Sequence, residues 1–163
     1  MIRFLVMDVD GTLTDGKIYM GQDGELFKAF DIKDGYGVKC LLPEVNIIPV
    51  VITARNSRIV ENRCHEMGVS ELYQGKMDKY ATLMQILRKY SELDKTDYTL
   101  ANVAYIGDDL LDLQCMQPIK EAGGFIACPN DAIEEVKNIA NYVAAKDAGD
   151  GAVREIIERI INA

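Results

Sequence analysis

The sequence predicts an α/β fold in which helices cover both faces of a parallel sheet. Three short apolar runs, Phe4–Met7, residues 50–52 and Val103–Ile106, are typical of strands buried on both faces. The segments between these runs change to a helical period. Strands that alternate with helices predict right-handed crossovers, and a length of 163 residues predicts one domain over residues 1–163.

The first element after residues 4–7 is a predicted β-hairpin over about residues 17–30. Its turn is Gly21-Gln22-Asp23-Gly24, which predicts a loop of four to five residues. Both hairpin strands are apolar on both sides, so the hairpin needs cover on two faces. We expect another subunit to supply part of that cover. The alternative is that the hairpin folds back over its own sheet.

The next elements are a helix over about residues 34–42 and a strand that starts at Val50, because Pro49 cannot donate to a ladder. An edge position for Pro49 is the alternative. A short strand over Glu71–Tyr73 and a polar surface connection over residues 91–102 follow. Three apolar stripes at helical spacing predict the later helices: Ile59, Val60, Cys64 and Met67; Leu83, Ile86, Leu87 and Tyr90; Val153, Ile156, Ile157, Ile160 and Ile161.

Composition excludes several classes of function. The chain has 18 basic and 26 acidic side chains and a net charge of -8, which disfavours nucleic acid and membrane surfaces as partners. No apolar run approaches the ~20 residues that span a bilayer, and Asp8 comes too early for a signal peptide. We therefore expect a cytoplasmic protein with reduced thiols at its four cysteines. Its single histidine, His65, excludes a multi-histidine metal site but leaves an oxygen-liganded metal open.

Polar residues follow each of the three buried strands. Asp8 and Asp10 come directly after residues 4–7, Thr53 follows residues 50–52, and Asp108 follows Val103–Ile106. Parallel strands bring their carboxyl ends to one edge of the sheet, where α/β proteins bind ligands. Close carboxylates repel one another unless a cation lies between them or one holds a proton. With Lys79 nearby, the pattern predicts a metal and phosphate site.

Structural explanations for single residues stay open at this point. Turn aspartates would account for Asp8 and Asp10 taken alone. A helix cap with first-turn acids would account for Asp109 or Asp112. Lys79 could be a solvated lysine at a helix start that Asp78 caps.

These motifs together resemble those of the haloacid dehalogenase-like phosphohydrolases, in which the same residue types occur in this order. The likeness extends to residues 30–37 and 52–55, to residues 73–75 and to residues 151–155, which look like the 3-deoxy-octulosonate 8-phosphate phosphatases and their nonulosonate relatives. It covers nearly the whole chain. The resemblance implies a Rossmann-like fold and a phosphatase that uses Mg²⁺.

The resemblance also implies roles for individual residues. Asp8 would attack phosphorus to give an aspartyl phosphate, and Asp10 would act as general acid and then general base. Mg²⁺ would bind the side chains of Asp8 and Asp108 and the backbone carbonyl of Asp10. The resemblance implies that Thr53 and Lys79 bind the phosphate group. The rest of the substrate would contact Asp34, Gly35 and Arg55. Asp109 and Asp112 would support the site.

The intervals between Asp8, Thr53 and Lys79 are too short to hold a cap domain. An open site admits water and cannot enclose a small substrate, so we expect a large substrate or a wall from another subunit. The capless branch of the family implies a homotetramer in which a neighbour's hairpin and C-terminal segment complete the site.

The substrate expected from the resemblance is a phosphorylated 2-keto-3-deoxy sugar acid. Arg55 is a candidate for its carboxylate, because a guanidinium binds a carboxylate through two parallel hydrogen bonds. Asp150 departs from the arginine that is common in octulosonate phosphatases at this position. A nonulosonate 9-phosphate phosphatase, a broad sugar-phosphate phosphatase and a tetramerisation module of low activity are the alternatives. The module is disfavoured, because every charged motif residue is present.

Overall fold

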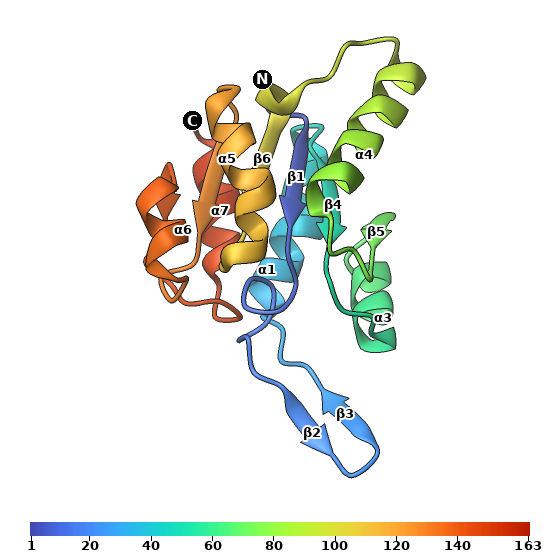
Figure 1. Cartoon of the computed structure of the whole chain (residues 1–163), viewed down its shortest axis with the longest axis vertical. Coiled ribbons are helices and arrows are strands. Elements are labelled where there is room, and N and C mark those ends of the chain that lie inside the picture. The colour runs from blue at the N-terminus through green and yellow to red at the C-terminus, as the bar shows by residue number, and fades with distance from the viewer.

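The computed structural model describes residues 1–163 and contains a six-stranded, fully parallel sheet (Figure 1). The strand order is β5-β4-β1-β6-β7-β8, so β1 lies between β4 and β6. The strands are β1 (Phe4–Met7), β4 (Ile48–Ile52), β5 (Glu71–Tyr73), β6 (Val103–Ile106), β7 (Phe125–Cys128) and β8 (Tyr142–Val143). The predicted α/β fold class is confirmed.

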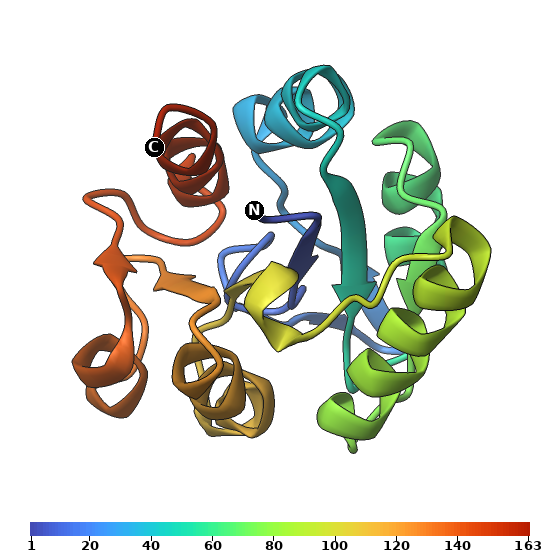
Figure 2. The same cartoon turned by 90° about the horizontal axis from the view of Figure 1, so that it is seen from above.

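Helices cover both faces of the sheet (Figure 2). One face packs against α1 (Ile32–Tyr36), a π-helical turn (Gly37–Leu41), α2 (Leu42–Glu44), α3 (Arg58–Glu66) and α7 (Ala152–Ile161). The other face packs against α4 (Lys79–Asp94), α5 (Leu113–Glu121) and α6 (Glu134–Ile139). Successive β1 side chains alternate between the two apolar clusters, with Leu5 in one and Val6 in the other. Burial on both faces explains why these strands are continuously apolar.

The hairpin consists of β2 (Tyr19–Gly21) and β3 (Gly24–Phe27) and extends away from the sheet (Figure 1). The predicted four- to five-residue loop is wrong, because Gly21 pairs with Gly24 and only Gln22 and Asp23 remain in the turn. Folding back over its own sheet, the alternative considered from sequence, is also wrong. Leu26 is 65% exposed and Met20 is 62% exposed, so much of the hairpin's apolar surface is uncovered.

Three other boundaries differ from the prediction. Strand β4 starts at Ile48 and includes Pro49. Ile48 donates to the Arg3 carbonyl on the β1 side, so Pro49 faces the β5 side, where pairing begins only at Val50. Pro49 is thus at a local edge, as the alternative held.

The predicted helix over residues 34–42 is instead a helical stretch from Ile32 to Glu44 with a π-helical turn at its centre. The connection predicted over residues 91–102 is partly helical. Helix α4 continues to Asp94, and a single 3₁₀ turn forms at Leu100–Asn102. No helix in the structure is both long and apolar enough to span a bilayer. The four cysteines are unpaired, and all except Cys40 are buried.

Candidate active site

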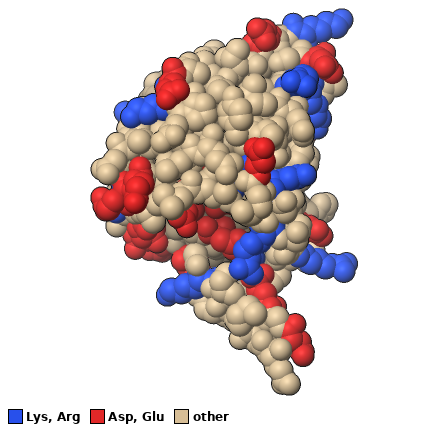
Figure 3. Space-filling view, viewed as in Figure 1, with Lys and Arg blue, Asp and Glu red and all other residues tan.

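The carboxyl ends of β4, β1 and β6 lie side by side at the edge of the sheet from which the hairpin extends (Figure 1). Asp8 directly follows β1 and is 9% exposed. Thr53 directly follows β4 and is buried, and Asp108 lies two residues after β6. Acidic side chains gather on the surface where the hairpin joins the body (Figure 3). The parallel sheet therefore brings together strand ends that are far apart in sequence.

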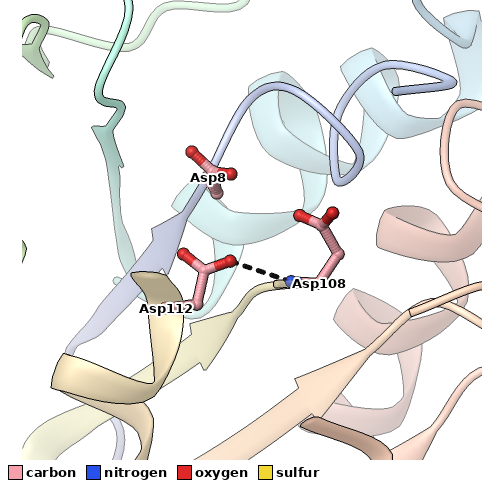
Figure 4. A group of neighbouring side chains, drawn as sticks. All are labelled: Asp8, Asp108 and Asp112. Atoms are coloured by element: carbon pink, nitrogen blue, oxygen red, sulfur yellow. Dashed lines mark hydrogen bonds between the residues drawn. The ribbon is translucent and has the colours of Figure 1, made fainter. Parts of the chain in front are cut away.

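Three carboxylates converge at this edge. Asp8, Asp108 and Asp112 each offer an oxygen, and these three oxygens lie within 4.8 Å of one another (Figure 4). Burial and the charge of Asp112 raise the pKa of Asp8 to about 7, and the same two causes raise the pKa of Asp108 to about 8. A cation at this point would relieve the repulsion. The donors are all oxygen atoms, which fits a hard divalent ion such as Mg²⁺.

Asp112 is fully occupied by hydrogen bonds within the protein. Its Oδ1 accepts from the Tyr105 hydroxyl at 2.8 Å and from Lys79 Nζ at 2.8 Å. Its Oδ2 accepts from the backbone N–H of Asp108 at 2.9 Å and of Asp109 at 3.2 Å. Asp112 therefore fixes the turn after β6, and the Asp8 and Asp108 side chains remain as candidate metal ligands. The exposed Asp109 accepts from the Leu110 N–H, as a cap residue does.

Lys79 is buried at the first position of α4, with its side chain only 1% exposed. Its Nζ lies 2.8 Å from Asp8 Oδ1 and 2.8 Å from Asp112 Oδ1. Burial alone would lower the pKa of Lys79, but the two carboxylates raise it, so the side chain stays an ammonium. The solvated-lysine alternative is wrong, although Asp78 does cap the helix by accepting from the Ala81 N–H.

The loop after β1 folds closely over Asp108. Thr12 Oγ1 donates to Asp108 Oδ1 at 2.9 Å, a contact that sequence reasoning missed. Gly11 has φ +87°, and a Cβ at this position would lie 2.1 Å from Asp108 Oδ2. Only glycine combines this backbone conformation with so close an approach. Gly11 and Thr12 therefore both serve the placement of Asp108 in the carboxylate cluster.

The side chain of Asp10 points to the hairpin. Its Oδ1 accepts from Lys28 Nζ at 2.6 Å, and Lys28 also donates to Glu25 Oε2 at 3.0 Å. Glu25 in turn lies 3.5 Å from the half-exposed Arg55 and accepts from the Ser57 hydroxyl at 3.2 Å. Sequence reasoning missed Glu25 and Lys28. The signal was there, because they are the charged residues that flank Leu26 and Phe27 in an otherwise apolar strand.

Asp34 and Gly35 contact helices rather than the three carboxylates. Asp34 Oδ1 accepts from the backbone N–H of Arg154 at 2.8 Å, in the first turn of α7. Burial raises the pKa of Asp34 to about 7. A Cβ at Gly35 would lie 2.2 Å from an Arg63 guanidinium nitrogen. Both residues fit α1 against its neighbours, and their role in substrate binding stays a prediction.

Two solved structures similar to this one are phosphatases with a bound metal ion. The cobalt-bound deoxy-D-mannose-octulosonate 8-phosphate phosphatase of Haemophilus influenzae has a TM-score of 0.87 at 32% identity, and the match covers 99% of this chain and 88% of that one. The Moraxella catarrhalis enzyme, in complex with a magnesium ion, a phosphate ion and a KDO (3-deoxy-D-manno-octulosonate) molecule, has a TM-score of 0.87 at 37% identity, with 99% and 86% covered. Fold and site together define a phosphatase of the haloacid dehalogenase superfamily.

Similar curated protein sequences identify the family within this superfamily. The 3-deoxy-D-manno-octulosonate 8-phosphate phosphatase of Salmonella typhi is 41% identical over 160 residues, which are 98% of this chain and 79% of that protein. The Yersinia pestis enzyme is 39% identical over 163 residues, with 98% and 80% covered. No family model matches the chain. The chain belongs to the family of 3-deoxy-D-manno-octulosonate 8-phosphate phosphatases.

Proposed function

We propose that this protein is a Mg²⁺-dependent phosphomonoesterase that hydrolyses 3-deoxy-D-manno-octulosonate 8-phosphate. The observation that carries the proposal is the convergence of the Asp8, Asp108 and Asp112 oxygens within 4.8 Å, beside the buried ammonium of Lys79. The Moraxella catarrhalis relative, solved with a magnesium ion, phosphate and KDO, supports the choice of metal and substrate. Mg²⁺ bound by Asp8 and Asp108 would neutralise charge on the transferring phosphoryl group.

In the proposed reaction Asp8 is the nucleophile. One of its oxygens bonds to phosphorus while the bond from phosphorus to the sugar oxygen breaks, which leaves an aspartyl phosphate. Asp10 gives its proton to the departing sugar oxygen. It then takes a proton from the water that attacks the aspartyl phosphate, so that phosphate leaves and Asp8 is regenerated. Lys79 and the Thr53 hydroxyl hold phosphate oxygens in both steps.

We propose that Arg55 binds the sugar-acid carboxylate. Its guanidinium is half-exposed and meets Glu25 at 3.5 Å. An ion pair this exposed is worth little, so a substrate carboxylate can displace Glu25 at small cost. Arginine suits this task because its planar guanidinium can make two parallel hydrogen bonds to a carboxylate.

A phosphate-release assay against several sugar phosphates tests the proposal. We expect kcat/KM for 3-deoxy-D-manno-octulosonate 8-phosphate to exceed that for glucose 6-phosphate by about 100-fold or more, because only the former offers a carboxylate to Arg55. A nonulosonate 9-phosphate should fall between the two. Chelation should abolish turnover, and added Mg²⁺ should restore it. A flat substrate profile would favour a broad phosphatase, and turnover without any divalent ion would exclude the metal.

We also propose that the protein is a homotetramer in which neighbouring hairpins cover one another and, with the C-terminal segments, complete the open sites. The support is the row of exposed apolar side chains on the protruding hairpin, which isolated monomers rarely display. These side chains are Ile18, Met20, Leu26 and Phe27.

A charge placed on the hairpin should therefore disrupt the assembly. We expect Leu26→Asp to lower the mass measured by light scattering and to raise KM for the sugar-acid phosphate, because an unpaired charge is costly to bury. The matched control is Leu93→Asp on α4, since Leu93 and Leu26 are both 65% exposed. The control should leave mass and KM unchanged. A wild-type protein that is monomeric at assay concentration would contradict the proposal.

A further inference from the structure

Lys28 is buried although it follows directly on an exposed hairpin strand. Its side chain is 1% exposed, whereas Leu26 and Phe27 before it are 65% and 50% exposed. Burying an ammonium costs free energy unless carboxylates surround it. Lys28 meets two, Asp10 at 2.6 Å and Glu25 at 3.0 Å. The contact with Asp10 links the base of the hairpin to the loop after β1.

Only one of the two carboxylate oxygens of Asp10 has a hydrogen-bond partner in the protein. Oδ1 accepts from Lys28 Nζ, and Asp10 makes no other side-chain hydrogen bond. The hydrogen bond fixes the plane of the carboxyl group and leaves Oδ2 free. Oδ2 is therefore the Asp10 oxygen that is left to contact the substrate.

Lys28 is itself fixed by a second set of contacts. Glu25 Oε2 accepts from Lys28, and Glu25 Oε1 accepts from the Ser57 hydroxyl at 3.2 Å. Ser57 precedes α3, and its backbone N–H donates to the Gln74 side chain at 2.8 Å. Contacts therefore run from the loop between β4 and α3 through Glu25 to Lys28 and Asp10. The hairpin base is tied to both sides of the site.

From this geometry we propose that Lys28, fixed by Glu25, is a positioning residue that aims Asp10 Oδ2 at the departing sugar oxygen. The inference rests on the proposed function. As the bond from phosphorus to the sugar oxygen breaks, its electron pair stays on that oxygen, which takes the proton from Asp10 Oδ2. Lys28 keeps its own protons throughout and forms no bond to the substrate.

Leaving groups that differ in their need for a proton test this role. In Lys28→Met we expect kcat for 3-deoxy-D-manno-octulosonate 8-phosphate to fall about 10- to 100-fold, because a misplaced acid loses much of its effect. With p-nitrophenyl phosphate the fall should be less than about threefold, because nitrophenolate departs without a proton. KM should stay within about threefold on both substrates. Lys28→Arg, which keeps the charge and the donors, should recover most of kcat.

The control is Lys95→Met, which removes an exposed lysine from the loop after α4 and should leave kcat unchanged on both substrates. Equal losses of kcat on the two substrates in Lys28→Met, or no loss on the sugar-acid phosphate, would overturn the positioning role. If Lys28→Met does not fold, as thermal unfolding would show, Lys28→Gln and Lys28→Arg give the same comparison. A wild-type protein that hydrolyses neither substrate would instead overturn the proposed function, so the two failures are distinct.

Discussion

Asp8→Asn is expected to abolish phosphate release and to leave the folded structure intact. Asparagine has the shape of aspartate, but its amide cannot form the aspartyl phosphate, so kcat should fall by at least about 10⁴-fold. Folding should tolerate the change. Burial already raises the pKa of Asp8 to about 7, so its charged form is disfavoured in the folded protein and a neutral side chain removes that cost.

The measurement combines phosphate release with thermal unfolding. The matched control is Asp97→Asn, an exposed aspartate in the loop after α4, which should retain full activity. Acid quenching during turnover should trap one phosphoryl group on Asp8 of the wild-type protein, visible by mass spectrometry of the peptide, and none in Asp8→Asn. Full activity in the variant, or a phosphoryl group trapped on another residue, would exclude Asp8 as the nucleophile.

The elements that were predicted correctly from the sequence are those with a strong hydrophobic period or a continuous apolar run. Strands β1 and β6 match the apolar runs residue for residue, and α7 matches its stripe of isoleucines. Sequence patterns did not predict β7 or α5, nor β8, which has two residues, and α6, which has six. Elements this short contain too few residues to show a period. Their positions are fixed by pairing with β7 and by packing on the sheet.

The same contrast holds for the site. The meeting of Asp8, Thr53 and Asp108 could be predicted because parallel strands place their carboxyl ends at one edge. The contact between Asp10 and Lys28 could not, because it depends on the direction in which the hairpin leaves the body. The four hydrogen bonds to Asp112 depend likewise on the tight turn after β6. Spacing along the chain carries no information on such tertiary geometry.

Lys79→Met is expected to remove both activity and stability. Methionine fills the space of the lysine stem but leaves Asp8 and Asp112 without their shared counter-charge. Breaking a buried ion pair from one side costs about 3 kcal/mol of unfolding free energy, and losing a phosphate-binding cation should lower kcat by about 100-fold or more. Urea unfolding at pH 8, without a divalent ion, measures the first effect, and phosphate release measures the second.

The matched control is Lys89→Met on the same helix, since Lys89 pairs with Glu71 at 2.6 Å but is 48% exposed. An exposed pair contributes about 0 to 1 kcal/mol, so this variant should keep nearly full stability and all its activity. The loss of unfolding free energy in Lys79→Met should shrink as the pH falls from 8 to 5. Asp8, whose pKa is about 7, then takes up a proton in the folded state and no longer needs the ammonium, while in the unfolded chain, with its ordinary pKa of 3.8, it stays ionised at pH 5. A deficit that grows toward pH 5, or one equal to that of Lys89→Met, would show that the buried ammonium does not compensate the carboxylates.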